Sequence, residues 1–560
     1  MIPIATSLLI SLVSSHADAP DADLVLHGGR IVTLDQRCPV AQALATRAGR
    51  IVLVGSDADV QGMIGPKTRV IDLQGRLAIP GFVESHAHFV GLGQAKALLD
   101  LSTAETWEEI VQRVKAAVQQ TPPGQWILGR GWHQEKWKQT PEPNVGGYPV
   151  HRALSDASPH HPVRLTHASG HLCVANAEAM RLAQVTRSTR PPDGGEILHD
   201  AAGELAGVFR EAAQDLIGPR EGDALERRQS LLRAIELAGQ DCLSEGITSF
   251  QDAGSDFDTI DVFRELAESR RLPVRLWVMV LDDPLQMQPR LARYRMVGVG
   301  DDYLTVRAVK QFCDGALGAH GAWLLEPYDD LPTSAGLNTT SPAAIERVAE
   351  LAVRFDYQLC VHAIGDRANR TMLDLFEQVF RRHPSETSRR WRIEHAQHLH
   401  PDDIPRFAEL GVIASMQAVH CTSDAAFVIA RLGRQRAATG AYAWQSLLKS
   451  GAIIANGTDA PVEDVDPLSC FYASVTRKPA SGNAFFPEQR MTRQQALRSY
   501  TLDAAYAAFE DDRKGSLTPG KLADVVVLSE DILTCPEERI RSAQVVYTII
   551  GGQVRYQRER

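Results

Sequence analysis

The chain has 560 residues, of which 44% are hydrophobic and 23% charged, and its formal net charge is −10. This length is too great for one simple core, so we expect a globular protein of two or more domains. The negative balance argues against nonspecific binding to nucleic acid or to anionic lipid.

The first segment of the chain, residues 1–19, reads MIPIATSLLISLVSSHADA. An apolar run of this length followed by small residues is typical of a signal peptide, although no Lys or Arg precedes it. We therefore predict export to the periplasm or the medium; if the segment is only an apolar leader, the protein is cytoplasmic. No later run is long and uncharged enough to span a membrane, so no stable membrane insertion is expected.

The two ends of the remaining chain share one pattern. Residues 20–78 alternate apolar and polar side chains between frequent turns, as in ADLVLHGGRIVTLD, and residues 508–560 repeat this style in KLADVVVLSEDIL. Such alternation predicts short antiparallel strands. We interpret the two segments as one small discontinuous β-sandwich domain that both ends of the chain complete.

Between these ends, residues 79–507 favour an α/β fold. From about residue 247, apolar runs of strand length alternate with helical segments, and this rhythm predicts a parallel sheet covered by helices. Seven such runs follow residue 247, and LAIPGFVESHAH near residue 80 makes eight, the number in a (β/α)8 TIM-like barrel. Residues of about 100–245 break the rhythm, so we predict a large insertion after the first strand that covers the barrel mouth.

Chemically useful side chains follow several of these strands. His86 and His88 lie two apart at the end of the first strand, so both imidazoles leave the same face. Active sites of such barrels lie at the C-terminal ends of the strands. A single histidine there is usually structural, but the set of matching positions is larger: His86, His88, Lys310, His362, His395 and Asp459. Together they predict a metal site, since imidazole and carboxylate suit zinc and similar ions.

The sequence resembles the amidohydrolase superfamily, and in particular the branch that contains N-substituted formamide deformylase. The resemblance rests on the motifs PGFVESHAH, KQFCDGALG, VHAIGDRAN, RIEHAQ, GTDAP and GSLTPGKLADVVVL, and within the insertion on WILGRGW and SGHLCVANAEAM. It extends over nearly the whole chain from about residue 22. It implies a hydrolase that cleaves carbon–nitrogen bonds other than peptide bonds.

The resemblance also implies a binuclear metal centre. It assigns His86, His88 and Asp459 to one divalent ion, and His362 and His395 to the other. We expect zinc, although manganese, iron or nickel would also accept these ligands. The eight cysteines include no C-x-x-C pair, so a thiolate site is not expected.

Lys310 has a special role in this scheme, because a lysine ammonium cannot be a metal ligand. By the resemblance, its amine combines with carbon dioxide to form a carboxylated lysine that bridges the two ions. The alternative is a structural ion pair between Lys310 and Asp314.

The function that we predict is hydrolysis of an amide, an N-substituted formamide or another N-acyl compound. A hydroxide that bridges the ions would attack the carbonyl carbon, and Asp459 would carry the proton to the leaving nitrogen. One alternative is a mononuclear deaminase of a cyclic amidine; such enzymes use a glutamate after the fifth strand, where this chain has AIGDRAN. Another is a non-catalytic scaffold, which would lack several of the ligands.

The expected partner is a small amide-type molecule, and a homodimer is the default oligomer. Three residues are candidates for substrate contacts. His171 matches the branch resemblance near the substrate, and Trp132 could line an apolar pocket or pack in a core. His320 stands where the branch commonly carries an arginine.

Overall fold

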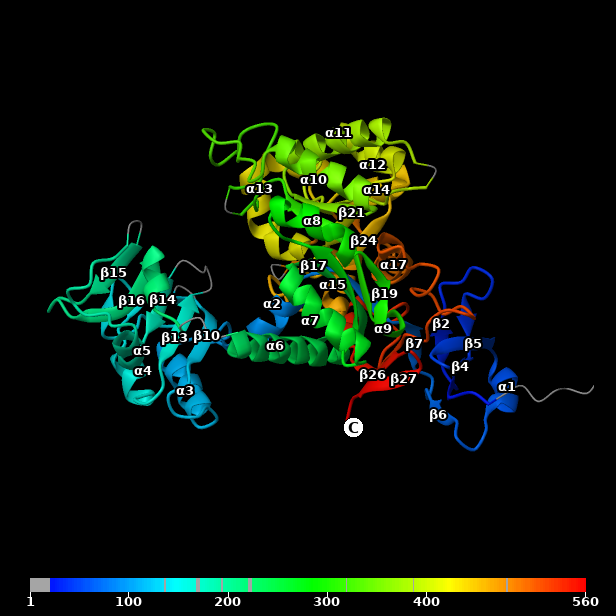
Figure 1. Cartoon of the computed structure of the whole chain (residues 1–560), viewed down its shortest axis with the longest axis horizontal. Coiled ribbons are helices and arrows are strands. Elements are labelled where there is room, and N and C mark those ends of the chain that lie inside the picture. Colours follow the sequence, from blue (N-terminus) through cyan, green and yellow to red (C-terminus); the bar gives the residue numbers. More distant parts are fainter. Residues whose placement is uncertain are drawn as a thin grey trace, which may run out of the picture. The chain divides into compact units, whose positions relative to one another are not determined.

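We describe a computed structural model of the chain at residues 21–134, 137–167, 172–192, 195–219, 224–318, 320–385, 387–479 and 482–559 (Figure 1). It forms two compact units: Met1–Phe89 with Gly239–Arg560, and Val90–Ala238. The predicted signal peptide, residues 1–19, lies outside the described residues and stays a prediction. Among the described residues, no helix combines the length and the apolar character that a membrane span requires.

The centre of the first unit is a nearly closed barrel of eight parallel strands, which confirms the predicted fold class. Their order in the sheet follows the chain from β8 to β24. The strands are β8 (Phe82–Ala87), β17 (Ile247–Ser255), β18 (Arg275–Val280), β20 (Leu304–Phe312), β21 (Gln358–Ala363), β22 (Arg392–His395), β23 (Ile413–Gln417) and β24 (Ile454–Gly457). The short β19 (Met296–Gly298) pairs antiparallel with β20.

Backbone hydrogen bonds bring the first and last strands of the barrel together. The amide of Asp459 donates to the carbonyl of His86, and the amide of His88 donates to the carbonyl of Ala460, both at 2.8 Å. Gly457 permits this approach, because a Cβ there would lie 2.2 Å from Oε1 of Glu84. The two ends of the predicted metal-binding set, near residues 86 and 459, therefore meet at one seam.

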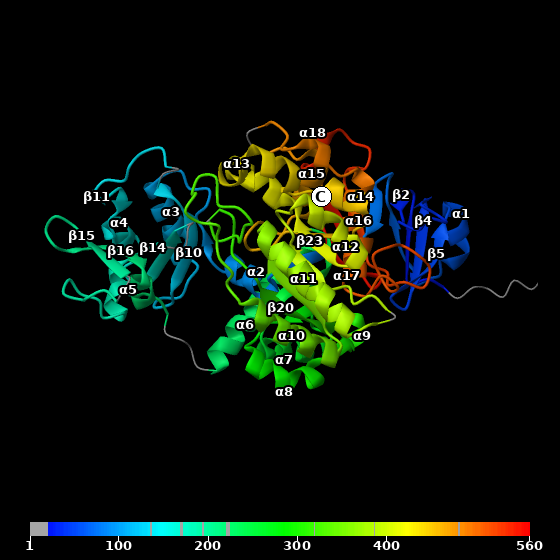
Figure 2. The same cartoon turned by 90° about the horizontal axis from the view of Figure 1, so that it is seen from above.

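Amphipathic helices cover the barrel. In α10 (Pro342–Phe355) the buried residues Ile345, Val348, Ala349 and Ala352 follow the spacing of one helical face, and Ser341 caps its first turn. Figures 1 and 2 show α10 beside α11 (Asp366–Arg382), which in turn lies next to α12 (Ile404–Leu410). The unit's other helices are α1 (Asp57–Val60), α7 (Phe257–Glu268), α8 (Pro284–Tyr294), α9 (Val299–Asp302), α13 (Ala418–Gly440), α14 (Trp444–Ser450), α15 (Pro467–Thr476), α16 (Arg493–Ser499), α17 (Leu502–Ala507) and α18 (Glu537–Ile540).

Two predicted strands end differently in the structure. VIASMQAVH is one of the seven apolar runs after residue 247 that the sequence predicts as strands, but β23 stops at Gln417 and α13 begins at Ala418. The amide of Ala418 donates to the side-chain oxygen of Asn456 at 3.0 Å. His420 therefore lies on a helix. The run LAIPGFVESHAH is divided at Gly81 into β7 (Leu77–Pro80) and β8, and only β8 joins the barrel.

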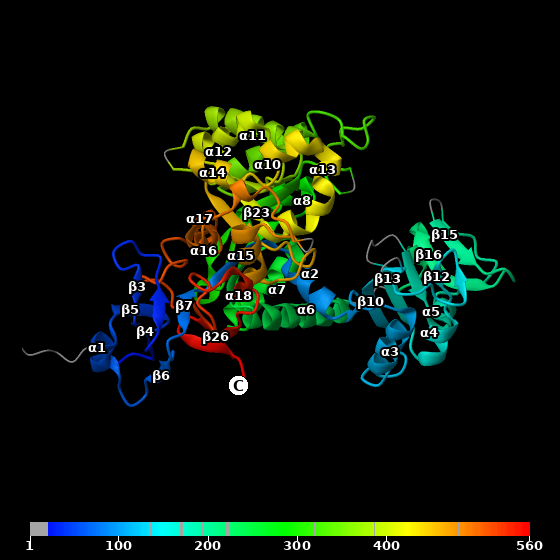
Figure 3. The same ribbon diagram turned by 180° about the vertical axis from the view of Figure 1, so that it is seen from behind.

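Strands from both ends of the chain build a sandwich beside the barrel. One sheet has the order β5-β4-β1-β6 and the other β27-β26-β25-β7-β2-β3; Figure 3 shows the N-terminal β7 near the C-terminal β26. The remaining bounds are β1 (Leu24–His27), β2 (Arg30–Val32), β3 (Val40–Ala41), β4 (Ala43–Arg47), β5 (Arg50–Gly55), β6 (Arg69–Asp72), β25 (Val525–Leu528), β26 (Val545–Ile550) and β27 (Gln553–Gln557). Alternate residues of the two sheets share one core, among them Leu24, Leu26, Val525 and Val527.

The second unit contains the predicted insertion and has its own sheet, ordered β15-β16-β14-β13-β10-β9. Its strands are β9 (Leu99–Asp100), β10 (Ile127–Trp132), β13 (Val163–His167), β14 (Leu172–Ala175), β15 (Gly195–His199) and β16 (Leu205–Glu211), with a hairpin of β11 (Asn144–Val145) and β12 (Tyr148–Pro149). Its helices are α3 (Trp107–Val118), α4 (Arg152–Ala157) and α5 (Ala177–Leu182); α2 (Phe89–Lys96) and α6 (Ala224–Ser244) span its boundaries. That the insertion covers the barrel mouth stays a prediction.

Candidate metal centre

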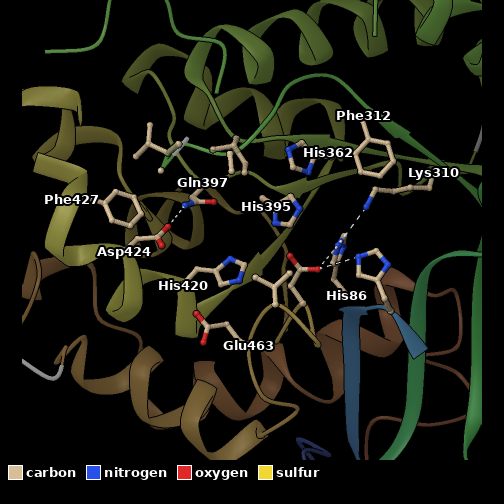
Figure 4. Close-up of a pocket in the computed structure, with 17 residues that line it drawn as sticks. His86, Lys310, Phe312, His362, His395, Gln397, His420, Asp424, Phe427 and Glu463 are labelled. Atoms are coloured by element: carbon tan, nitrogen blue, oxygen red, sulfur yellow. Dashed lines mark hydrogen bonds and ion pairs between the residues drawn. The ribbon is translucent and has the colours of Figure 1, made fainter. Parts of the chain in front are cut away.

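The barrel brings all six predicted metal-site residues to one pocket of about 400 Å³ (Figure 4). They come from the ends of five strands that are far apart in sequence, as the lining shows: His86, His88, Lys310, His362, His395 and Asp459. Convergence at the C-terminal ends of parallel strands is where a barrel of this kind places an active site.

Asp459 lies at the middle of this group. Its Oδ1 is 3.5 Å from Nε2 of His86 and 3.4 Å from Nε2 of His88. One possible ligand atom from each of His86, His395 and Asp459 lies within 4.8 Å of the others. This spacing leaves room for an ion among the three side chains.

The histidine rings are oriented from behind by other polar side chains. Nδ1 of His86 bonds the carboxylate of Glu394, and Nδ1 of His395 is 2.6 Å from Oε1 of Gln417. With Nδ1 engaged, each ring keeps Nε2 for the pocket. This is the usual arrangement of metal-binding histidines, whose second nitrogen is held by a carboxylate or amide.

His362 completes the group of imidazoles. Its ring centroid is 4.5 Å from that of His395. Its Nε2 is buried without a hydrogen bond among the described residues and lies 3.6 Å from Oδ1 of Asp314. A buried nitrogen without a partner is costly in a folded protein, and a bound ion at the neighbouring site would account for this ring position.

Burial favours the neutral form of the His86 and His362 rings. It lowers the pKa of His86 to about 4 and that of His362 to about 3, so both rings carry a free lone pair near pH 7. Burial raises the pKa of Asp459, but the hydrogen bond from His88 and the interactions with the neighbouring rings outweigh this effect, and the pKa of Asp459 is well below its usual value. Neutral rings and an ionised carboxylate are the donor set that a divalent metal requires.

Lys310 is only 1% exposed, and its Nζ lies 3.5 Å from Nε2 of His86. Burial lowers the pKa of its amine. Within the described part of the chain, no carboxylate forms an ion pair with it. The alternative partner, Asp314, instead accepts backbone hydrogen bonds from Trp323, Ile364 and Gly365 at 2.8–2.9 Å. The pairing of Lys310 with Asp314 is therefore not what the structure contains.

Two residues of the site have unusual backbone conformations. His395 has φ +74° and Asp459 has φ +61°, both in the left-handed region. Such conformations cost roughly 1–3 kcal/mol each and cluster at functional sites. A hydrogen bond from the backbone amide of Asp459 to the carbonyl of His86 holds the turn at Asp459.

A polar layer that the sequence motifs did not predict lies beneath the pocket. Arg392 and Glu394 are fully buried and form an ion pair at 2.7 Å, and Arg392 also donates to the hydroxyl of Ser415 at 2.7 Å. Glu84 accepts hydrogen bonds from the amide of Thr458 at 2.8 Å and from the hydroxyl of Tyr500 at 3.0 Å. The available signal was a charged residue inside an apolar strand, since a buried charge needs partners.

The three predicted substrate contacts have different surroundings. Trp132 is fully buried in the core of the insertion, where its ring stacks on Trp137 and its Nε1 donates to the carbonyl of Leu165. His320 faces Asp330 at 3.1 Å and is not among the residues that line the pocket. His171 lies outside the described residues.

Comparison with known proteins extends this description to the whole chain. The model of the Amidohydrolase family matches residues 69–556. Protein LONG AFTER FAR-RED 3 of Arabidopsis thaliana is 36% identical, over 96% of this chain and 92% of that protein. N-substituted formamide deformylase of Arthrobacter pascens is 28% identical, over 96% of this chain and 98% of that protein. An uncharacterized metal-dependent hydrolase from Pyrococcus horikoshii superimposes with a TM-score of 0.73 at 26% identity, over 92% of this chain and 99% of that one.

Proposed function

Because the chain belongs to the amidohydrolase family, we propose that it hydrolyses the carbon–nitrogen bond of an amide, namely an N-substituted formamide or another N-acyl compound. The family match confirms the resemblance predicted from the motifs, and the chain is a metal-dependent hydrolase. The observation that supports our finer proposal most is the convergence of neutral imidazoles, one carboxylate and a buried lysine in one pocket.

In this proposal two divalent ions, zinc by preference, occupy the pocket. His86, His88 and Asp459 would hold one ion, and His362 and His395 the other. Lys310 would bridge them as a carboxylated side chain. Burial lowers the pKa of the Lys310 amine, and this shift supports the role, because only the neutral amine can form a nitrogen–carbon bond with carbon dioxide and release a proton.

The bound ions would supply an activated water and polarise the substrate carbonyl, since a divalent ion lowers the pKa of its water from 15.7 to about 7. The chain itself moves the proton. Asp459 would take it from the attacking water as the carbon–oxygen bond forms, and deliver it to the nitrogen as the carbon–nitrogen bond breaks. Nε2 of His88 lies 3.4 Å from Oδ1 of Asp459, so both side chains can reach the same ion.

The test is a panel of N-substituted formamides, other secondary amides and cyclic amidines, offered to the metal-loaded protein with and without bicarbonate. We expect turnover of formamides or amides, and higher activity with bicarbonate, which supplies the carbon dioxide for Lys310. Turnover of cyclic amidines alone would refute the amidase proposal and favour the deaminase. Turnover of none of the three classes would also refute it.

A further inference from the structure

The wall of the pocket beyond the six metal-site residues has a one-sided charge. In the described part of the chain, eleven further residues line it, and the formally charged ones among them are Asp424 and Glu463. None of these eleven is a lysine or an arginine. A substrate that reaches this wall therefore meets two carboxylates, and no lysine or arginine compensates them among the described residues of the wall.

Asp424 is held in position by two donors. The hydroxyl of Tyr442 donates to its Oδ2 at 2.6 Å. Nε2 of Gln397 donates to the same oxygen at 2.8 Å, and Figure 4 draws this second bond. Tyr442 is itself 2% exposed. Within the described contacts, Oδ1 accepts no hydrogen bond. This oxygen of a fixed carboxylate is available to a ligand in the pocket.

His420 provides an independent sign of a ligand. Its side chain lines the pocket, the residue is 8% exposed, and its buried Nε2 has no hydrogen-bond partner among the described residues. Figure 4 shows it between Asp424 and His395. Native proteins seldom leave a buried ring nitrogen unsatisfied, so a polar group of a bound molecule is expected to reach it.

Glu463 lies in the loop that follows β24 and is held there by a hydrogen bond from α13. The hydroxyl of Ser423, on the first turns of α13, donates to its Oε1 at 2.6 Å. This bond ties α13 to the loop that carries Asp459. Glu463 and Asp424 thus belong to two segments that the structure joins at the same side of the pocket.

The rest of the wall is apolar and includes Phe312, Leu317, Ile364 and Phe427. A cavity of about 400 Å³ lined in this way accepts a small molecule with a hydrocarbon body. The metal-site residues and the carboxylates then lie at two polar regions of one apolar cavity.

We propose that the substrate is an amide that carries a positive charge on the part remote from the scissile bond, as an ammonium or guanidinium group. Asp424 and Glu463 bind this cation through charge-assisted hydrogen bonds, and Nε2 of His420 accepts a further one. An N-acyl compound with a free carboxylate at that end is disfavoured, because like charges would meet. The inference rests on the proposed amide hydrolysis and specifies its substrate class.

Three formamides of one shape test the proposal: N-benzylformamides that carry a para-aminomethyl, para-ethyl or para-carboxylate group. The aminomethyl and ethyl compounds match in size and differ in charge. We expect kcat/KM to be at least about 10-fold higher for the cation than for the ethyl compound, and lowest for the carboxylate. Calorimetry on the same metal-loaded protein gives Kd values for any compound that is not turned over.

Two variants assign the preference to the wall. Asp424→Asn should bring the kcat/KM of the cationic compound close to that of the ethyl compound, so that their ratio is near one. Glu463→Gln should reduce this ratio in part. Asp464→Asn, an exposed neighbour that does not line the pocket, should keep the wild-type ratio. If Asp424→Asn does not fold, the ratio of kcat/KM measured for the two compounds in Glu463→Gln decides whether the wall causes the preference.

Equal kcat/KM values for the cationic and ethyl compounds in the wild-type protein would overturn the inference. Hydrolysis of none of the formamides or amides would instead overturn the proposed function. In that case the Kd ratio would still decide whether the wall binds a cation.

Discussion

The carboxylate of Glu394 bonds Nδ1 of His86, and both side chains are completely buried. This contact fixes which nitrogen of His86 faces the pocket. Glu394 is held in turn by Arg392, so the orientation of a metal-site histidine depends on a charged pair inside the barrel.

Glu394→Gln should therefore weaken metal binding while leaving all six pocket residues in place. Loss of such a supporting carboxylate typically lowers metal affinity about 10- to 100-fold. Titration of the metal-free protein with zinc, against a competing chelator, measures the change. Glu409→Gln, at an exposed position on α12, is the control and should bind zinc as the wild type does. Unchanged affinity in Glu394→Gln would show that Glu394 does not support the site.

Asp459→Asn should lower kcat while much of the metal remains bound. The amide keeps one oxygen for an ion but cannot take a proton from water, and a positioned acid–base contributes roughly 10²- to 10⁴-fold. Steady-state rates and metal content, measured on the same sample, separate the two roles. A rate near that of the wild type would exclude Asp459 as the proton carrier.

Asp524→Asn should destabilise the first unit without touching the site. Asp524 and Arg275 form a two-pronged ion pair, at 2.8 and 3.1 Å, between the sandwich and barrel strand β18, and both are almost fully buried. Breaking a buried pair costs about 3–5 kcal/mol, because it leaves one charge without its partner.

The thermal midpoint and the denaturant midpoint of Asp524→Asn measure this cost. Glu346→Gln is the matched control, since it breaks the exposed pair with Arg382, and it should cost less than about 1 kcal/mol. Equal midpoints for the two variants would contradict the assigned role of the buried pair.

The alternation of apolar runs with helical segments was sufficient to predict the barrel. Apolar runs such as YQLCVHAIGD become β21 because they are buried on both faces, and that pattern is visible in the sequence. The boundary at Gln417 was not visible, since Ala418 and Val419 suit a strand as well as a helix. A side-chain contact from Asn456, 38 residues away, accompanies the start of the helix there.

The pocket residues were predictable for a similar reason. His362 and His395 end neighbouring strands, and parallel pairing places such ends side by side. The supporting contacts were not predictable, because Glu394 reaches His86 across 308 positions of sequence. The place of Trp132 was not predictable either, since an aromatic residue of a pocket and one of a core look alike in sequence. Its full burial identifies Trp132 as a core residue.

The metal content of Lys310→Ala tests the central claim most directly. Wild-type protein and Lys310→Ala are loaded with zinc in bicarbonate, and zinc per chain is measured by mass spectrometry beside kcat on a formamide substrate. The account predicts two ions per wild-type chain at full activity, and at most one in Lys310→Ala with turnover largely lost. Full wild-type activity at one ion per chain, or two ions and normal turnover in Lys310→Ala, would contradict it.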